Sequence, residues 1–521
     1  MDVCTRIPAF VCLPVELQDA ICRDEVLCKA DLASLALSCK AWYSVANAVL
    51  WETLSCIESL VRLMPKEVWT GMSPCFPDRD LPSHYWESVS HLSSLVKHLY
   101  LSGIDPAFQF IIVRNTPPVT LLPSLRSLSI SAATEDAFEI INAFADSPGA
   151  PFFEALTPTL QHLTFINVCG AVLCPNAGVF YKATQLTSLS VYQTDEGEAD
   201  DTYDHDCIRE AIIQIISNCR QLMNVYLSLP LIRHPSLLEA LSRLPVLDCL
   251  TLKFYGTIAE ENREDCQPDY AARGFPNLRS CFVHGLSFNE AADLIKFEGT
   301  RTLHDLRIDS TVLDSPADFA ALTETIRRYC SPAHLRVIKF WRDTWVPHSD
   351  NPGHWPLSYE HAEPLTAFPR LTTVMISDFC DTTIRDAEWA RMARSWPELQ
   401  ILYIPIYKGM DMPANPSTLV ALAAFAEYCP LLRHILIPFD ASNLPSLQPA
   451  TETVVERDDQ VLIEIGFPED IASAEDVVGF MRSWYGKVTV SLRFPTTPPE
   501  EDLEFQRRMD LWEQVMVMTS G

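Results

Sequence analysis

The chain has 521 residues but only 16 glycines, and it lacks the short motifs that cradle phosphate groups. No G-x-G-x-x-G, G-x-x-x-x-G-K or G-x-S-x-G sequence occurs; these are typical of nucleotide-binding loops and serine hydrolases. Cys169 and Cys174 have no second pair or histidine couple at zinc spacing. His348, His354 and His361 share one loop, at spacings unlike a helical metal pair. We therefore expect no active site, no metal and no cofactor, and so not an enzyme.

Basic charge is also scarce, with 39 Lys and Arg residues against 68 Asp and Glu residues and a formal charge of −29. A surface this acidic repels phosphate backbones and anionic lipids, so we expect no nucleic-acid and no membrane partner. The apolar run LVALAAFA, residues 419–426, is too short to cross a bilayer. The start, MDVCTRIPAFVCLP, has no signal-peptide pattern. Seventeen scattered cysteines then indicate reduced thiols in the cytoplasm, the nucleus or both.

What the chain does contain is a repeat of the pattern L-x-x-L-x-[LIVF], at spacings of 25 to 36 residues. Within each copy apolar and polar residues alternate, which predicts a short strand with one buried face. The copies begin at Val96, Leu125, Leu160, Leu186, Leu222, Leu247, Leu278, Leu303, Leu335, Leu371, Leu399 and Leu432. Helical stretches lie between the strands. In SPADFAALTETIRRYC, for example, Phe319, Leu322, Ile326 and Tyr329 mark one helical face.

Neither a lone strand nor a lone amphipathic helix can bury its apolar side, but stacked copies form one continuous core. This part resembles a leucine-rich-repeat domain, so the expected fold class is α/β, a solenoid or horseshoe with strands inside and helices outside. We place the solenoid at 91–440. We call it irregular, because the spacing between copies varies and the asparagine or cysteine that usually follows the strand is mostly missing. Residues 441–521 read as C-terminal repeats and a cap, ending in an amphipathic helix.

Ahead of the repeats, residues 13–51 read LPVELQDAICRDEVLCKADLASLALSCKAWYSVANAVLW. Pro14 favours a helix start, and Leu17 and Ile21 are four apart on one helical face. Asp31 predicts the cap of a second helix, and Trp42 lies in a third apolar stripe. About forty residues are too few to bury a core of their own, so we expect something else to cover their apolar side chains.

This front block resembles the F-box. The matching residues are Leu13, Pro14, Glu16, Leu17, Ile21, Asp31, Leu32, Leu35, Cys39, Trp42, Leu50 and Trp51. Two departures are a loop, RDEVLCKA, about two residues longer than the commonest form and Cys22 at a position usually held by a bulkier apolar residue. We assign 8–54 to this small all-helical module and 55–90 to a linker and first-repeat helices.

The resemblance implies docking on a Skp-type adaptor, and through it on a cullin–RING (SCF-type) ubiquitin ligase. The chain would then be the substrate receptor in ubiquitin-dependent protein degradation, with an unknown protein target. The expected adaptor-binding residues are Leu13, Pro14, Leu17, Ile21, Leu32, Leu35, Trp42, Leu50 and Trp51. The alternative is an interaction scaffold outside any ligase, whose front helices only cap the first repeat.

Residues that alternate with the buried ones in each repeat predict the target-binding surface on the concave face. Late in the chain this row becomes aromatic, apolar and cationic, as binding hot spots are: Phe282, Arg307, Lys339, Trp341, Met375, Tyr403 and Leu436. The alternative is that the cap or a long loop covers these strands.

Two loops offer further candidates. The acidic insertion 193–206 suits a basic peptide or is simply solvated. In TWVPHSDNPGHWPLSYEHAEP, Trp345, Trp355 and Tyr359 either touch a partner or anchor their loop.

Overall fold

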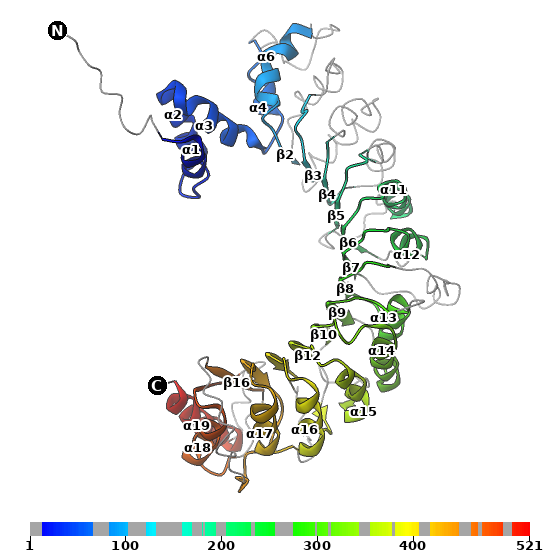
Figure 1. The fold of residues 1–521 in the computed structure, drawn as a ribbon, viewed down its shortest axis with the longest axis vertical. Coiled ribbons are helices and arrows are strands. Elements are labelled where there is room, and N and C mark those ends of the chain that lie inside the picture. Colours follow the sequence, from blue (N-terminus) through cyan, green and yellow to red (C-terminus); the bar gives the residue numbers. More distant parts are fainter. Residues whose placement is uncertain are drawn as a thin grey trace, which may run out of the picture. The chain divides into compact units, whose positions relative to one another are not determined.

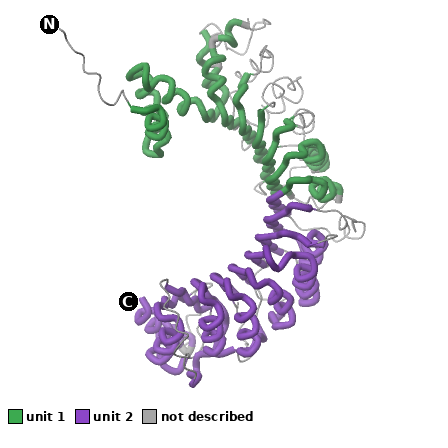
Figure 2. The backbone as a smooth tube through the Cα atoms, viewed as in Figure 1, with its two compact units in different colours: residues 1–247, 255–260 green, residues 248–254, 261–521 purple. Residues whose placement is uncertain are grey.

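The structure is a computed structural model in which the chain forms two compact units, residues 1–247 with 255–260 and residues 248–254 with 261–521 (Figure 2). The residues that it describes are 13–65, 83–102, 121–131, 159–168, 180, 183–193, 205–230, 235–255, 275–296, 300–310, 314–342, 355–377, 381–405, 417–446, 460–466, 471–492 and 503–520.

Unit 1 begins with three helices and continues with six of the fifteen strands of the main sheet. Its helices are α1 (Val15–Cys22), α2 (Lys29–Ser38), α3 (Lys40–Glu52), α4 (Glu58–Val61), α6 (Ser83–Ser93), α11 (His205–Asn218) and α12 (Pro235–Ser242). Its strands are β1 (Thr53–Leu54), β2 (His98–Ser102), β3 (Ser127–Ser131), β4 (His162–Ile166), β5 (Ser188–Tyr192) and β6 (Asn224–Pro230). From β1 to β6, neighbouring strands pair in parallel in chain order.

Unit 2 holds the other nine strands, again in chain order. They are β7 (Cys249–Tyr255), β8 (Ser280–His284), β9 (Asp305–Ser310), β10 (Val337–Arg342), β12 (Thr373–Ile376), β14 (Ile401–Tyr403), β15 (His434–Leu436), β16 (Val461–Ile465) and β17 (Val488–Leu492). Its helices are α13 (Phe288–Ile295), α14 (Pro316–Tyr329), α15 (Tyr359–Ala362), η4 (Glu363–Ala367), α16 (Asp386–Ser395), α17 (Leu419–Tyr428), α18 (Ala474–Tyr485) and α19 (Leu503–Thr519). The short strands β11 (Pro356–Leu357) and β13 (Asp381–Thr382) form a separate pair.

The core of each unit is a ladder of apolar residues in register. In unit 1 the register aligns Leu99 with Leu128, Leu163, Leu189 and Val225, and all five are buried. In unit 2 one such row is Leu250, Cys281, Leu306, Ile338, Val374, Leu402, Ile435 and Ile463. Helices α13 to α17 lie along this buried face (Figure 1). The opposite face of the sheet, which carries the alternating side chains, is called the open face below.

All twelve strands predicted from the repeat are present, and the first residue of every copy is buried. The backbone repeats as well. The carbonyl oxygen of Lys97 accepts from Arg126 N and Ser127 N, and that of Arg126 accepts from Gln161 N and His162 N. This pairing ties the entry of each strand to that of its neighbour. The predicted α/β class is thus confirmed, and parallel strands alternating with helices fit a solenoid-like fold.

The predicted helix between Leu303 and Leu335 is α14. Ser315 caps it, because its side chain accepts from Asp318 N while the Asp318 carboxylate accepts from Ser315 N. Phe319, Leu322 and Ile326 are buried, as their spacing predicts. Another stretch with helical periodicity, TEDAFEIINAFADS at residues 134–147, lies outside the described residues.

Beyond residue 440 the same architecture continues. Strands β16 and β17 pair in parallel at the end of the sheet order, with α18 between them. The predicted final helix is α19, which packs on α18 and β17. Its Trp512 is buried with its ring 6.2 Å from that of Phe439, and Thr519 Oγ1 accepts from Val490 N.

Candidate partner-binding surfaces

Residues at the starts of α1 and α2 explain why helices begin there in the front block. Pro14 precedes α1, and the Gln18 side chain donates to the Leu13 carbonyl oxygen at 2.9 Å. Helix α2 begins after Cys28, whose backbone N donates to Asp31 Oδ2 at 3.0 Å. Hydrogen bonds from the Cys28 side chain and backbone lower the pKa of Asp31. The negative charge of Asp31 then lies in the first turn, where the helix dipole stabilises it.

These helices bury a core of their own, contrary to our expectation from their length. It consists of Cys22, Leu32, Ala36, Trp42, Val45 and Ala46, with Leu13, Ile21, Leu27, Leu35, Cys39, Val49 and Leu50 packed against it. Leu32 and Trp42, predicted to contact an adaptor, are 6% and 0% exposed. They hold the three helices together, because the block's own apolar side chains surround them. We therefore withdraw both from the predicted docking set.

Other apolar side chains of the block remain in solvent. Leu17 in α1 is 51% exposed and Leu37 in α2 is 84% exposed, while Val15, Val26 and Tyr43 are exposed as well. Pro14 is exposed, and the remaining predicted residues, Leu13, Ile21, Leu35, Leu50 and Trp51, are half-buried. Exposed apolar side chains that gather in one patch mark an interaction site, which makes the outside of this block a candidate surface.

The block joins the first repeat through the end of α3. Glu52 forms ion pairs with Arg23 of the α1–α2 loop at 2.8 Å and with Lys97 at 3.0 Å. Its carbonyl oxygen also accepts from Lys97 N. Burial opposes ionisation of Glu52, but the bonds from Lys97 and Arg23 outweigh it and hold its pKa below the usual value. Helices α1 and α2 pack chiefly on α3.

The second candidate surface is the open face of unit 2, where the register confirms the predicted row. Phe282 of β8, Arg307 of β9, Lys339 of β10 and Met375 of β12 are successive partners. All four are half-buried, as is Trp341 two residues beyond Lys339. Parallel strands are about 4.8 Å apart, so these side chains lie side by side. The strip formed by Phe282, Arg307, Lys339, Trp341 and Met375 is called the cationic strip below.

Tyr403 and Leu436 continue the same row but are buried, at 3% and 1% exposure. Each is preceded directly in its strand by another buried residue, Leu402 and Ile435. Successive residues of a strand point to opposite faces, so both faces of the sheet are covered there. Neither residue belongs to the open surface, and the alternative of a covered face holds for this end of the row.

Charge in the cationic strip is unevenly paired. Arg307 makes a two-pronged pair with Asp305, with Nε to Oδ1 at 3.0 Å and Nη2 to Oδ2 at 2.7 Å. Within the described residues Lys339 has no carboxylate partner, and its ammonium group lies 5.4 Å from the centre of the Trp341 ring. Burial, and then the charge of Arg307, lower the pKa of Lys339.

Sequence reasoning missed the neighbours of this row. Lys253 Nζ lies 5.5 Å from the centre of the Phe282 ring, and His284 Nδ1 is 2.8 Å from Asp309 Oδ2. Lys253, His284 and Asp309 lie in an adjoining row of the open face, in register with the predicted Trp341. His284 and Asp309 lie two residues beyond Phe282 and Arg307, so period-two alternation together with the register would have found this row.

The loop candidates are anchored where the structure describes them. Trp355 is buried and donates from Nε1 to the Asp314 carbonyl oxygen at 2.9 Å. The Tyr359 ring lies 4.5 Å from the Arg391 guanidinium carbon. His361 Nδ1 accepts from Ser358 N at 3.1 Å, and burial lowers the pKa of His361. Trp355 and Tyr359 thus fix the loop in place. Trp345, His348, His354, Cys169, Cys174 and residues 194–204 of the acidic insertion lie outside the described residues.

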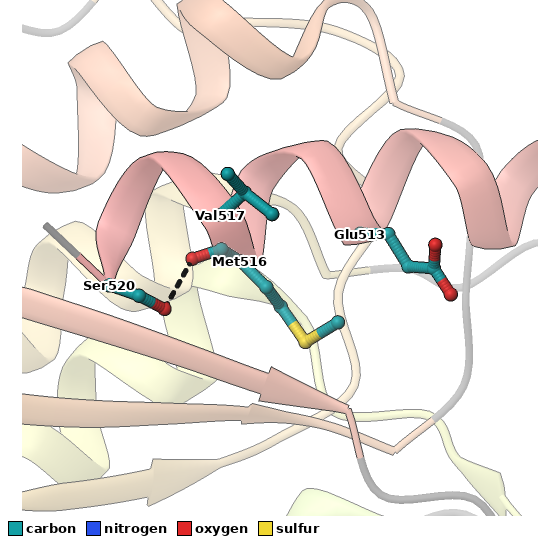
Figure 3. A pocket seen from close by; sticks show the side chains of 4 residues that line it. All are labelled: Glu513, Met516, Val517 and Ser520. Carbon is teal, nitrogen blue, oxygen red and sulfur yellow. Dashed lines mark hydrogen bonds between the residues drawn. The ribbon is translucent and has the colours of Figure 1, made fainter.

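The described part of the chain holds no group of three or more His, Cys, Asp or Glu residues able to bind a metal ion. None of its helices has the length and apolar character needed to cross a membrane. A hollow on α19 is lined by Glu513, Met516, Val517 and Ser520 (Figure 3). Ser520 Oγ donates to the Met516 carbonyl oxygen at 2.7 Å. Among the four lining residues, Glu513 is the one with a charged side chain.

Comparisons with known proteins add the following. No family model and no curated protein matches the chain. Among solved structures, the fold is similar to a chain in the crystal structure of the Rad7 and Elc1 complex in yeast, with a TM-score of 0.34 and 12% identity. The match covers 80% of this chain and 90% of that chain. A likeness at this level does not identify a function.

Proposed function

We propose that the chain is the substrate-recognition subunit of a cullin–RING ubiquitin ligase of the SCF type. In this proposal residues 8–54 are an F-box that docks on a Skp-type adaptor, and the leucine-rich repeats capture the protein target. The observation that carries the proposal is a block with F-box landmarks and its own core that leaves Leu17 and Leu37 in solvent. The subunit itself catalyses nothing. It acts by proximity, raising the local concentration of target lysines beside a ubiquitin-charged enzyme.

The exposed side chains favour docking over capping. A cap protects a solenoid by turning its apolar residues toward the first repeat. Here α1 and α2 pack on α3, and polar bonds at Glu52 and Lys97 tie the block to the first repeat. Fully burying one large apolar side chain contributes about 1.5–3 kcal/mol. Covering Leu17, Leu37 and Val26 therefore offers an adaptor several kcal/mol that the repeats leave unused.

Co-purification of the full chain with a Skp-type adaptor tests this directly. Leu17→Asp and Leu37→Asp place charges at the proposed interface, and each should weaken binding at least about tenfold, since interface anchors contribute about 2 kcal/mol or more. Leu431→Asp is the matched control, because Leu431 of unit 2 is 52% exposed against 51% for Leu17. It should leave binding unchanged. Adaptor binding by the Leu17→Asp and Leu37→Asp proteins at the control level would refute docking through this face.

Truncation separates this role from a plain scaffold. The cut belongs after Glu52, because β1 pairs with β2 and Leu54 is buried beneath the first repeat. If residues 1–52 are a docking module, the remaining chain should stay soluble and monomeric and lose only the adaptor. If they are a cap, the shortened chain should aggregate, since its end strand and apolar core would be bared.

A further inference from the structure

The cationic strip places two like charges directly opposite each other. Arg307 and Lys339 are register partners on neighbouring strands β9 and β10. Like charges at directly opposed positions destabilise a sheet, and the Asp305 carboxylate forms both of its short bonds with Arg307. Among the described residues Lys339 is thus a half-buried cation without a paired carboxylate; burial and Arg307 lower its pKa, and the charge of Asp305 opposes them only in part. An anion placed beside Lys339 would relieve this repulsion.

The surroundings of Lys339 are apolar on two sides. Trp341 lies under its ammonium group, Met375 occupies the next strand, and Phe282 lies beyond Arg307. Aromatic rings, methionine and arginine are the residues enriched at the centres of protein interfaces. The strip can thus hold an apolar side chain between two cationic contacts.

We propose that the cationic strip binds a short acidic segment of a target protein, in which carboxylates flank an aromatic or aliphatic side chain. This names the class of target and rests on the proposed receptor role. Charge complementarity selects the occupant, because Lys339 and Arg307 are the cations of the row and Lys253 adds a third above Phe282. The segment must be short, since the chain as a whole carries a charge of −29 and repels an extended polyanion such as nucleic acid.

The test measures binding of a fluorescent peptide of alternating glutamate and phenylalanine to the full chain, without adaptor. The comparison peptide replaces every glutamate by glutamine and should bind at least about tenfold more weakly. Lys339→Met keeps the aliphatic stem and should weaken binding of the acidic peptide about tenfold, and Lys339→Glu about a hundredfold or more. Lys339→Arg keeps the charge and should retain binding. The control is Lys296→Met, since Lys296 lies at the end of α13 and pairs with Asp293.

Several results would overturn the inference. Equal binding of the two peptides would show that charge plays no part. Wild-type binding by both Lys339→Met and Lys339→Glu would show that the peptide binds elsewhere. A single-stranded oligonucleotide that competed with the peptide and depended on Lys339 more strongly would identify a phosphate site instead.

The peptide experiment and the adaptor experiment test the two proposals separately. Leu17→Asp, which should weaken adaptor binding at least about tenfold, should bind the acidic peptide like the wild-type chain. A wild-type chain that bound the adaptor but not the acidic peptide would refute the acidic-segment inference alone, and one that bound the peptide but not the adaptor would refute the F-box docking alone.

Discussion

Replacing Trp42 by alanine should unfold the front block while the repeats stay folded. Trp42 is fully buried at the centre of the core shared by α1, α2 and α3. A buried aromatic side chain covers about 150–250 Å², and truncating tryptophan to alanine costs about 3–5 kcal/mol. The three helices have 8, 10 and 13 residues, which at 0.05–0.15 kcal/mol per residue gives a block stability of about 2–5 kcal/mol. The substitution removes most or all of it.

Hydrogen exchange read by mass spectrometry is the assay. In the Trp42→Ala protein the amides of α1 to α3 should exchange at nearly unprotected rates, while those of β2 to β6 keep their protection, because the ladder around Leu128 and Leu163 is a separate core. Tyr43→Ala is the control: this neighbouring aromatic residue is 48% exposed, and its loss should change stability by about 0.5 kcal/mol or less. Protection of α1 to α3 that survives Trp42→Ala, or that is lost together with that of β2 to β6, would refute a separately cored block.

Three further outcomes follow from single groups. Gly285→Ala should lower the melting temperature of unit 2 markedly, because Gly285 has φ +84° and a Cβ there would lie 2.1 Å from a backbone oxygen; Gly479→Ala in α18, with nothing within 4 Å, should leave it unchanged or raise it. The depressed pKa of Glu52 contributes stability above its ordinary value of 4.5 that is lost as the pH falls through the folded value; Glu52→Gln should thus be less stable than wild type at pH 7 and show a smaller loss in acid titration by circular dichroism. Burial raises the pKa of Cys281 to about 12, so iodoacetamide at pH 8 should modify exposed Cys28 and spare Cys281 until the chain is denatured, as peptide mass mapping would show.

The strands were predictable because their signal is local. Burial alternates with period two, so Leu306 and Ile308 fall on the core side and Arg307 on the open side without any knowledge of the fold. Aligning the copies even gave the register across strands, and the row from Phe282 to Met375 is the one observed. In a repeat, the register between strands that are far apart in the sequence can be predicted, because each copy fixes the position of its neighbour.

Burial by distant segments was not predictable. Tyr403 and Leu436 carry the same alternating pattern as Phe282, yet both faces of the sheet are covered around them. Such covering depends on how remote parts of the chain pack, and no pattern within β14 or β15 encodes it. At the front block, the number of residues led us to expect no separate core, yet Trp42 and Leu32, which match the F-box pattern, form the interior of the block. A motif match does not separate the residues that build a surface from those that present it.

The two candidate surfaces differ in the interaction that each offers a partner: apolar contact at the front block and charge at the cationic strip. The front block offers apolar area, exposed at Leu17 and Leu37, and such area gives affinity with little dependence on salt. The cationic strip offers charge at Lys339 and Arg307, which gives selectivity and association rate and weakens as ionic strength rises. The proposed receptor role would use both kinds, because an adaptor contact would have to persist while a target exchanges. Because the strip belongs to unit 2 and the block to unit 1, each surface rests on its own core, and changes at one should leave binding at the other intact.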